Sequence, residues 1–402
     1  MLNVVYVAPF PMETTLRFAR ALAKQQNTRL LGVFQVAPPG SSSRLFHDIV
    51  TVSAGTSAAQ IEKAVRLLQA KHGPIHRVIG ILEQLQEPLA VVRSRLGITG
   101  MKPKIAHRFR DKAEMKRVLT AHNIPCARYA MVNTIDEAWN FIDKVGFPVV
   151  LKPPAGAGCK ATYRISHPAA LMNAFSEIPV RPILAEEFLH GVEYSMETFT
   201  LHGKPRFVSF SRYYPSPLEV MQNPWIQWVV LFPKQLQDPI FTKAKQAGFA
   251  AIQALGLDTA MTHMEWFQRR DGSVAIGEIG ARPPGAQIAQ MTGLIHGFDA
   301  HEAWAKLMVH ETFDMNVKRQ KSGAIVFLRG KGHGRIVSIE GLAEAQKKMG
   351  ALVHKVSLPK IGALRSSSYE GDGWVIILHD NTEVVKKAAL ELIQTVKVRY
   401  QY

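Results

Sequence analysis

The segment from Thr262 to Gly280 constrains the fold most strongly, because it has the pattern of a β-hairpin with an acidic residue in each arm. Its Asp271-Gly272 dipeptide is a preferred two-residue hairpin turn, so the residues on either side of the dipeptide are expected to pair. Counting outward from that turn places Glu265 directly opposite Glu278, with Cβ atoms about 5 Å apart on one face of the sheet. The sequence therefore predicts two carboxylates held side by side.

Two facing carboxylates repel each other unless a cation lies between them. Mg²⁺ is usually held by one or two carboxylates together with substrate phosphates, so Glu265 and Glu278 are candidate Mg²⁺ ligands, with Mn²⁺ as a substitute. The alternative is a solvated acidic pair on an exposed face, and a register error of one residue would separate the two side chains. The apolar residues that flank both glutamates favour the metal site.

A lysine and a run of small residues follow another strand-like segment. Lys152 ends the apolar run that starts at Phe147, and the small residues after it include Gly156, Ala157 and Gly158. Backbone N–H groups of such a loop can surround phosphate oxygens, while the lysine supplies a point charge. The alternative is an ordinary hairpin loop with a solvated lysine.

Arg282 follows Glu278 by four residues and precedes Pro283-Pro284-Gly285. This stiff segment would fix the guanidinium near the two carboxylates, where it could stabilise negative charge on a transferring phosphoryl group or an acyl-phosphate. A structural ion pair is the alternative interpretation.

The order of strand-like and helix-like segments predicts an α/β protein. Apolar runs at 3–8, 30–34 and 75–79 alternate with amphipathic helices, as in a small parallel α/β lobe. No G-x-G-x-x-G follows the first strand, which argues against a dinucleotide site. Asp111 is a candidate helix cap, and mostly strand-like segments follow from residue 147.

Composition excludes several classes of protein. The chain has 402 residues, of which 47% are hydrophobic and 20% charged, and no stretch approaches the roughly 18 apolar residues of a membrane span. Two cysteines and the lack of a leader pattern favour the cytoplasm. The net charge of +17 raises the question of nucleic acid, but no aromatic–basic recognition pattern accompanies it. An anionic small molecule such as a nucleotide is therefore the preferred partner, with neither nucleic acid nor a membrane expected.

In the order and spacing of these motifs the sequence resembles the ATP-grasp superfamily, and specifically carboxylate–amine ligases such as bacterial L-amino-acid ligases. The resemblance covers about residues 1–320. It implies an ATP-grasp fold with an N-terminal parallel α/β lobe, a small lobe with a mobile phosphate loop, a large lobe with the metal and substrate site, and a small α+β C-terminal lobe. The expected boundaries of these four parts are 1–105, 106–190, 191–320 and 321–402.

The resemblance also implies roles for individual residues. Those expected to bind ATP are Lys112, Lys152, Gly156, Ala157, Gly158, Glu186 at the adenine amino group, Glu187 and Leu189 at the adenine ring, and Glu193 at the ribose. Metal binding is expected of Glu265 and Glu278, and a catalytic, substrate-side role of Arg282.

One position departs from the family pattern. The family has Glu-x-Asn after the second strand of the hairpin, whereas this chain has Glu278-Ile279-Gly280, so one metal ligand is missing. The hairpin register places His263 opposite Gly280. Its imidazole either fills the space of the missing ligand or is simply packed or solvated.

The resemblance implies an ADP-forming enzyme that makes an acyl-phosphate from ATP and a carboxylate, which an amine then attacks. Amino acids or peptide-like acids are the expected substrates, ATP and Mg²⁺ the cofactors, and a homodimer is left open. The alternatives are an ATP-dependent carboxylase or kinase with the same nucleotide site, and a non-catalytic nucleotide-binding or nucleic-acid-binding module. Candidates for lining the acceptor pocket, or equally for packing, are Tyr213, Tyr214, Trp225 and Trp228.

Overall fold

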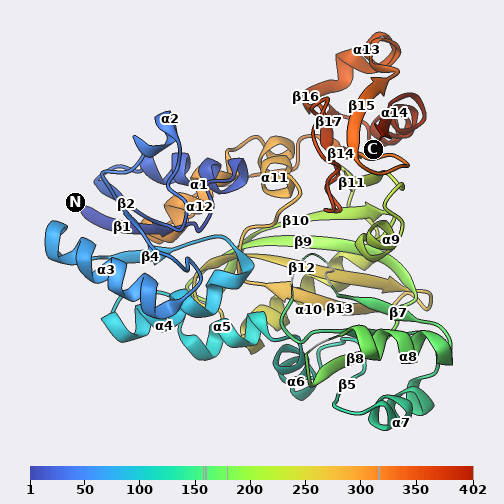
Figure 1. Cartoon of the computed structure of the whole chain (residues 1–402), viewed down its shortest axis with the longest axis horizontal. Helices are drawn as coiled ribbons and strands as arrows, with labels where there is room; N and C mark the ends of the chain where they lie inside the picture. The colour runs from blue at the N-terminus through green and yellow to red at the C-terminus, as the bar shows by residue number, and fades with distance from the viewer. Residues whose placement is uncertain (157, 159–160, 179, 316, 402) are drawn as a thin grey trace.

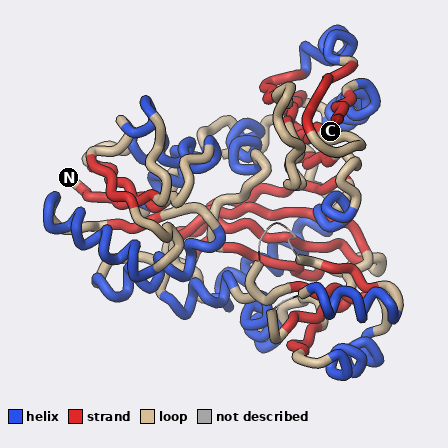
Figure 2. Tube along the Cα trace, in the orientation of Figure 1, coloured by secondary structure: helices blue, strands red, loops and turns tan. Residues whose placement is uncertain are grey.

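The computed structural model describes residues 1–156, 158, 161–178, 180–315 and 317–401. Strands run through the middle of the molecule and most helices lie around them, as Figure 2 shows. Figure 1 follows the chain from an N-terminal lobe (blue), through a lobe at the lower right (green), to a C-terminal lobe at the upper right (red). The mixed α/β class expected from the sequence is confirmed.

The N-terminal lobe is a parallel sheet with helices packed on it, as expected. The sheet order is β3–β2–β1–β4, and β1 (Leu2–Val7), at the centre, is almost entirely buried. The other strands are β2 (Thr28–Phe34), β3 (Asp48–Thr51) and β4 (Arg77–Ile79). The helices are α1 (Glu13–Ala23), α2 (Gly40–Ser43), α3 (Ala58–His72), the 3₁₀ turn η1 (Glu83–Leu85) and α4 (Gln86–Leu96).

Two helices, α5 (Pro103–Arg110) and α6 (Lys112–Ala121), lead into a small antiparallel sheet. Asp111 caps α6 as expected, because its side chain accepts a hydrogen bond from the N–H of Glu114 at 2.8 Å. The sheet order is β5–β8–β6–β7, and two helices pack on it. These elements are β5 (Tyr129–Val132), α7 (Ile135–Val145), β6 (Val149–Lys152), β7 (Tyr163–Ile165), α8 (Pro168–Glu177) and β8 (Ile183–Glu187).

A large antiparallel sheet forms the centre of the molecule, in the order β13–β12–β9–β10–β11–β14–β17–β16. Helix α10 packs on one face of its first strands. The elements up to residue 310 are β9 (Gly191–Leu201), β10 (Lys204–Tyr214), α9 (Pro217–Gln222), β11 (Trp228–Phe232), α10 (Pro239–Leu255), β12 (Ala260–Arg269), β13 (Val274–Gly280), α11 (Ile288–His296) and α12 (Ala300–His310).

The C-terminal residues continue this sheet and add a small unit beside it. β14 (Ser322–Leu328) pairs with β11, so the large sheet runs across residue 320. The remaining elements are β15 (Arg335–Glu340), α13 (Leu342–Met349), η2 (Gly350–Leu352), β16 (Val353–Ser357), β17 (Gly373–His379), α14 (Thr382–Thr395) and β18 (Lys397–Gln401). β15 and β18 pair with each other in a separate two-stranded sheet.

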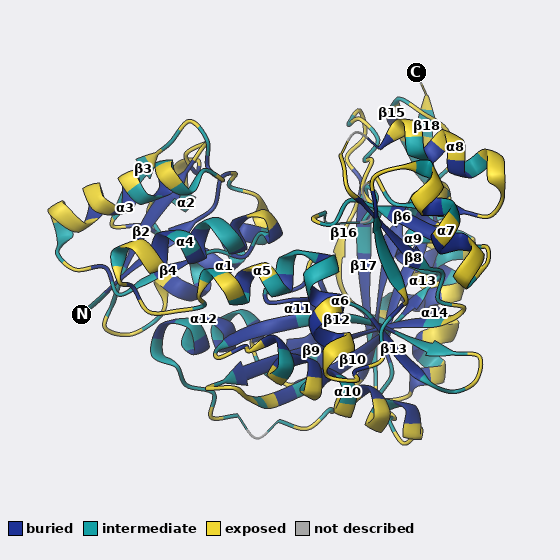
Figure 3. Ribbon diagram, turned by 90° about the horizontal axis from the view of Figure 1, so that it is seen from below, coloured by how far each residue is buried: buried dark blue, intermediate teal, exposed yellow. Residues whose placement is uncertain are grey.

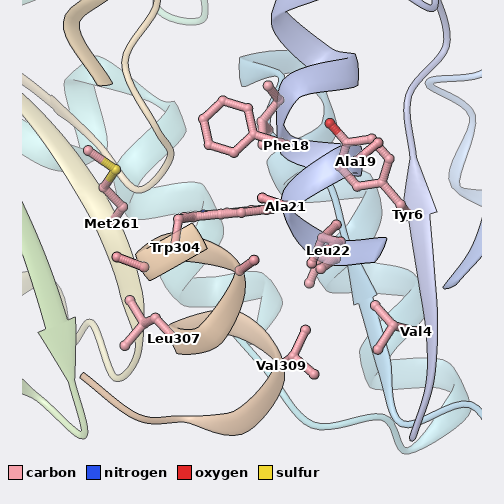
Figure 4. Close-up of a cluster of buried hydrophobic side chains, with 14 of the residues drawn as sticks. Val4, Tyr6, Phe18, Ala19, Ala21, Leu22, Met261, Trp304, Leu307 and Val309 are labelled. Carbon is pink, nitrogen blue, oxygen red and sulfur yellow. The ribbon is translucent and has the colours of Figure 1, made fainter. Parts of the chain in front are cut away.

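Buried side chains join the N-terminal lobe to the large sheet. In Figure 3 the strands of that sheet are mostly buried, while the outer faces of the surrounding helices are exposed. Figure 4 shows Phe18 and Leu22 of α1 packed with Trp304 and Leu307 of α12 and with Met261 of β12. The rings of Phe18 and Trp304 meet edge-on at 4.9 Å. Helix α12 therefore fixes the N-terminal lobe relative to β12, the strand that carries Glu265.

Candidate active site

One face of the large sheet carries a band of polar residues across neighbouring strands. Glu197 of β9 lies opposite His263 of β12, which in turn lies opposite Gly280 of β13. Two residues further along the hairpin, Glu265 lies opposite Glu278. Since successive side chains of a strand point to opposite faces, the residues between them face α10 instead. These apolar neighbours are Met196, Met264 and Ile279.

The expected pairing of Glu265 with Glu278 is observed, but the turn expected to set it is not. The turn is a three-residue loop, because the N–H of Arg269 bonds to the C=O of Ser273 at 2.8 Å. Beside the turn, the pairing of the two strands is therefore shifted by one residue from the expected pairing. A bulge at Gly277 then restores it just before the glutamates. The two deviations cancel, so the carboxylates face each other although the predicted two-residue turn was wrong.

A lysine lies beside the carboxylate pair. Nζ of Lys112, the first residue of α6, is 3.0 Å from Oε1 of Glu278. Burial raises the pKa of Glu278, but the positive charges of Lys112, Lys152 and Arg282 outweigh burial and lower this pKa to about 2. Burial and the nearby charge of Glu278 raise the pKa of Glu265. The two facing glutamates therefore differ in how readily they ionise.

Lys152, at the end of β6, shares a buried carboxylate with another lysine. Nζ of Lys152 is 3.0 Å from Oε2 of Glu186, and Nζ of Lys116 is 3.3 Å from Oε1. Burial raises the pKa of Glu186, but the two lysines outweigh burial and lower it. Burial lowers the pKa of Lys152, but Glu186 and Glu278 outweigh burial and raise it. Glu186 and Lys152 are therefore both charged at neutral pH.

The small-residue loop after β6 is tied to the start of α6. The C=O of Gly156 accepts hydrogen bonds from Nη1 of Arg110 at 2.9 Å and from Nζ of Lys112 at 3.1 Å. Gly156 and Gly158 both line the pocket that contains the carboxylate pair. Ala157 lies outside the described residues. The loop and the lysine that binds Glu278 are thus held as one unit.

Three further residues assigned to the nucleotide do not line this pocket. Oε2 of Glu187 is 2.7 Å from Nε of Arg128. Leu189 follows the end of β8 and is half-buried. Glu193 is buried, and its burial together with the charge of Glu265 raises its pKa well above the usual range. These three side chains stand outside the pocket lining, which holds the two lysines and the carboxylate pair.

Arg282 lines the pocket and is also ion-paired. Its Nε contacts the carboxylate of Glu83, which is carried by η1 of the N-terminal lobe. Burial lowers the pKa of Arg282, but Glu83 outweighs burial and raises it. A Cβ at Gly280 would lie 3.4 Å from Oε2 of Glu83, so Gly280 borders the same pair. Arg282 is therefore ion-paired with Glu83 and also part of the pocket lining.

His263 is packed by polar partners on both sides of its ring. Nδ1 lies 2.9 Å from Oε1 of Glu197, a completely buried carboxylate that also accepts a hydrogen bond from Ser195 at 2.7 Å. Nε2 lies 3.5 Å from the hydroxyl of Tyr213 and 3.9 Å from Oε1 of Glu265. The ring is packed, as one interpretation expects, and it also lines the pocket, while its replacement of the missing metal ligand stays a prediction.

Four residues of this site were not singled out from the sequence: Lys116, Glu83, Glu197 and Tyr369. Lys116 lies one helical turn after Lys112, and that spacing is a signal that could have identified it. Glu83 and Glu197 come from segments far from their partners in the chain, and no local pattern marks them.

The pocket contains donors that fit a nucleotide triphosphate and Mg²⁺. Lys112, Lys152 and the glycines of the loop present cationic and N–H groups, while Glu265 and Glu278 present carboxylate oxygens. Among the described residues no group of three or more His, Cys, Asp or Glu forms a metal site. Phosphate oxygens or water would therefore have to complete the coordination of Mg²⁺, which is the usual arrangement for this ion.

Comparisons with known proteins find a similar domain in this chain. Residues 117–287 match the model of the ATP-grasp domain. An L-arginine-specific L-amino acid ligase of Bacillus subtilis is 23% identical over 341 residues, which are 82% of this chain and 82% of that protein. An alanine–anticapsin ligase of Bacillus subtilis is 24% identical over 53% of this chain and 49% of its own length.

A solved structure extends the likeness to the whole fold. The crystal structure of an L-amino acid ligase from Bacillus licheniformis superimposes with a TM-score of 0.83 at 18% identity, and covers 100% of this chain and 99% of that one. The chain therefore has an ATP-grasp fold, carries a match to the ATP-grasp domain at residues 117–287, and is similar to L-amino-acid ligases.

Proposed function

We propose that the protein is an ADP-forming ligase that joins a carboxylate to an amine through an acyl-phosphate. The observation that carries this proposal is one pocket in which Lys112, Lys152, the carboxylate pair and Arg282 converge. The similarity to L-amino acid ligases supports an amino acid or a peptide-like acid as the carboxylate substrate.

In this proposal each group of the pocket has one task. Lys112 and Lys152 hold the phosphates of ATP, and Glu265 and Glu278 hold Mg²⁺. Held by these two carboxylates, the ion would offset the negative charge of the phosphates. Arg282 orients the substrate carboxylate and stabilises the acyl-phosphate. A carboxylate oxygen attacks the γ-phosphorus and ADP leaves, after which the amine nitrogen attacks the acyl carbon, phosphate leaves, and the nitrogen loses a proton.

The residues around this centre are assigned to the rest of the nucleotide. Gly156 and Gly158 would bring backbone N–H groups to the phosphates. We assign Glu186, Glu187 and Leu189 to the adenine and Glu193 to the ribose. Because Glu186 binds both Lys116 and Lys152, its contribution includes holding Lys152 in position.

We also propose that the protein works in the cytoplasm. None of the described helices is long and apolar enough to cross a bilayer. Two cysteines in 402 residues agree with a reducing compartment.

The test is ADP release with ATP and Mg²⁺ across all pairs of the twenty amino acids, with N-acetylated amino acids, which have no free α-amine, and bicarbonate alone as controls. We expect release that requires both a carboxylate and an amine. Release with bicarbonate alone would indicate a carboxylase, and release without any amine would indicate a kinase. Retention on RNA or DNA in low salt, without ADP release, would support a nucleic-acid-binding module instead.

A further inference from the structure

Part of the pocket lining is mostly aromatic. We call this part the aromatic recess and define it by five lining residues: Tyr213, Pro217, Trp228, Ile288 and Tyr369. They come from β10, α9, β11, α11 and the segment before β17. Of the four aromatic residues singled out from the sequence, Tyr213 and Trp228 line the recess. Trp225 is exposed instead, and Tyr214 stacks against Arg212.

Trp228 is the base of the aromatic recess. Its ring lies 5.5 Å from the ring of Tyr213 and 5.0 Å from that of Tyr369, which meets it at 83°. Its Nε1 donates to the C=O of Pro215 at 3.1 Å, so the only polar atom of the indole is already bonded. On its other face it stacks on Phe327 at 5.0 Å. Trp228 therefore presents a fixed hydrocarbon surface to the recess.

Tyr369 closes the aromatic recess from the side of the C-terminal lobe. A Cβ at Gly158 would lie 3.3 Å from Cε1 of Tyr369, and a Cβ at Gly285 would lie 3.8 Å from its hydroxyl oxygen. The next residue, Glu370, accepts a hydrogen bond from the N–H of Ala286 at 3.2 Å. The ring is thus held between the phosphate loop and the segment that follows Arg282.

Arg282 lines the same pocket as the aromatic recess, so a substrate whose carboxylate binds Arg282 can place its side chain against the recess. Among the five residues that define the recess none is charged. An ionised side chain there would have no charged partner among these five residues, and burying a charge without a partner costs several kcal/mol or forces the group to become neutral. An apolar side chain would instead gain about 25 cal/mol for each Å² removed from water.

We propose that the aromatic recess binds the side chain of the carboxylate substrate and selects amino acids with apolar side chains. This inference rests on the proposed ligase function. Aromatic faces also attract cations, so a lysine or arginine side chain is the competing occupant that the test must separate.

The test traps the activated carboxylate and needs no amine substrate. Hydroxylamine converts an acyl-phosphate to a hydroxamate, which is measured with ATP, Mg²⁺ and one amino acid at a time. We expect kcat/KM for leucine, methionine or phenylalanine to exceed that for aspartate, lysine or arginine at least tenfold.

Variants of Tyr369 test the assignment of the recess. Tyr369→Asp is expected to lower the ratio of kcat/KM for leucine to that for lysine at least tenfold, whereas Tyr369→Phe should retain the preference for leucine. Tyr369→Ala enlarges the recess without adding charge and should shift the preference from leucine toward tryptophan. Trp225→Ala removes an exposed aromatic residue outside the recess and serves as the matched control, with an unchanged ratio.

The outcomes separate the inference from the proposed function. Each ratio is measured within one variant, so a general loss of ATP binding or of folded protein does not alter it. Hydroxamates formed equally from apolar and charged amino acids, or an unchanged ratio in Tyr369→Asp and Tyr369→Ala, would overturn the recess assignment while the ligase function stands. No hydroxamate from any carboxylate would overturn both.

Discussion

At the scale of single residues, the two facing glutamates have unequal surroundings. Glu278 is held ionised by three positive side chains, and its pKa is lowered to about 2. Glu265 faces that negative charge from a buried position, and its pKa is raised. Neutralising one or the other should therefore affect the metal-free protein in opposite directions.

We expect Glu265→Gln to leave the metal-free melting temperature unchanged or higher, because it removes a repulsion. Glu278→Gln should lower the free energy of unfolding by about 1–2 kcal/mol, because Lys112 loses its partner. Both variants should lose turnover. Thermal melts without Mg²⁺, together with ADP release, check this, and the pair is not the metal site if both variants remain active.

Lys152→Ala is expected to raise the Kd for Mg-ATP at least tenfold. It should also lower the free energy of unfolding by about 1–3 kcal/mol, because Lys116 is the one cation that Glu186 keeps among the described residues. The double variant Lys152→Ala/Glu186→Gln should recover stability but not nucleotide binding. Calorimetry and denaturant melts of both proteins separate the two effects, and unchanged ATP binding in a folded Lys152→Ala protein would contradict the assigned role.

Most candidate residues of the site could be predicted from local motifs, but their partners could not. The sequence pattern indicated Lys152 and Arg282 as cations near phosphate, and the family resemblance added Lys112. Neither indicated that Glu186 lies between two lysines or that Glu83 binds Arg282, because these contacts join segments brought together only by the fold.

At the scale of elements, the hairpin shows how far local rules extend. Its strands and the facing glutamates were predicted, but the loop has three residues and Gly277 forms a bulge. The bulge lies in β13 next to Ile276, whose N–H donates to the C=O of Pro125, and no pattern within the hairpin reveals this contact. The cap of α6 was predictable because Asp111 acts only on the adjacent turn.

Helix α11 contains a buried histidine that makes stability depend on pH. Burial, with the charge of Arg319, lowers the pKa of His296 to about 4, from about 6.5 when exposed. The unfolded chain therefore binds a proton first as pH falls. The contribution of His296 to the free energy of unfolding is complete above pH about 6.5. It decreases by about 3 kcal/mol as the pH falls toward 4.

We expect the loss of stability between pH 6.5 and 4 to be smaller in His296→Gln than in the unchanged protein. Denaturant melts at a series of pH values measure this difference. The exposed His354 offers a matched control, since His354→Gln should keep the full pH dependence. If the free energy of unfolding changes equally with pH in all three proteins, His296 does not titrate as its burial implies.

At the scale of the whole molecule, the site is assembled where the lobes meet. The central sheet supplies the carboxylates, α6 and β6 supply the lysines, and η1 of the N-terminal lobe supplies Glu83. The sequence predicted the N-terminal parallel lobe, but not that the central sheet continues past residue 320. Pairing of β11 with β14 joins strands about ninety residues apart, beyond the reach of local periodicity. The four-part division of the chain stays a prediction.

We expect the contact between Glu83 of the N-terminal lobe and Arg282 to affect the rate of reaction more than the affinity for the nucleotide. We expect Glu83→Gln to lower kcat/KM for the carboxylate at least tenfold and leave the Kd for Mg-ATP unchanged, because Arg282 loses its charged partner. Glu87→Gln is the matched control, since Glu87 pairs with His107 at 2.8 Å near the surface. Steady-state kinetics measure kcat/KM, and calorimetric titration with Mg-ATP measures the Kd. Equal kinetics in the two variants would contradict the role of Glu83.

The acyl-phosphate is the central claim, and transfer of oxygen from the carboxylate tests it most directly. The carboxylate substrate found by the ADP-release screen is labelled with ¹⁸O in both oxygens, and the released phosphate is analysed by mass spectrometry. Because the carboxylate oxygen that attacks phosphorus stays with the phosphate, one ¹⁸O for each phosphate released is the predicted result. Amide formation with no ¹⁸O in the phosphate would contradict it.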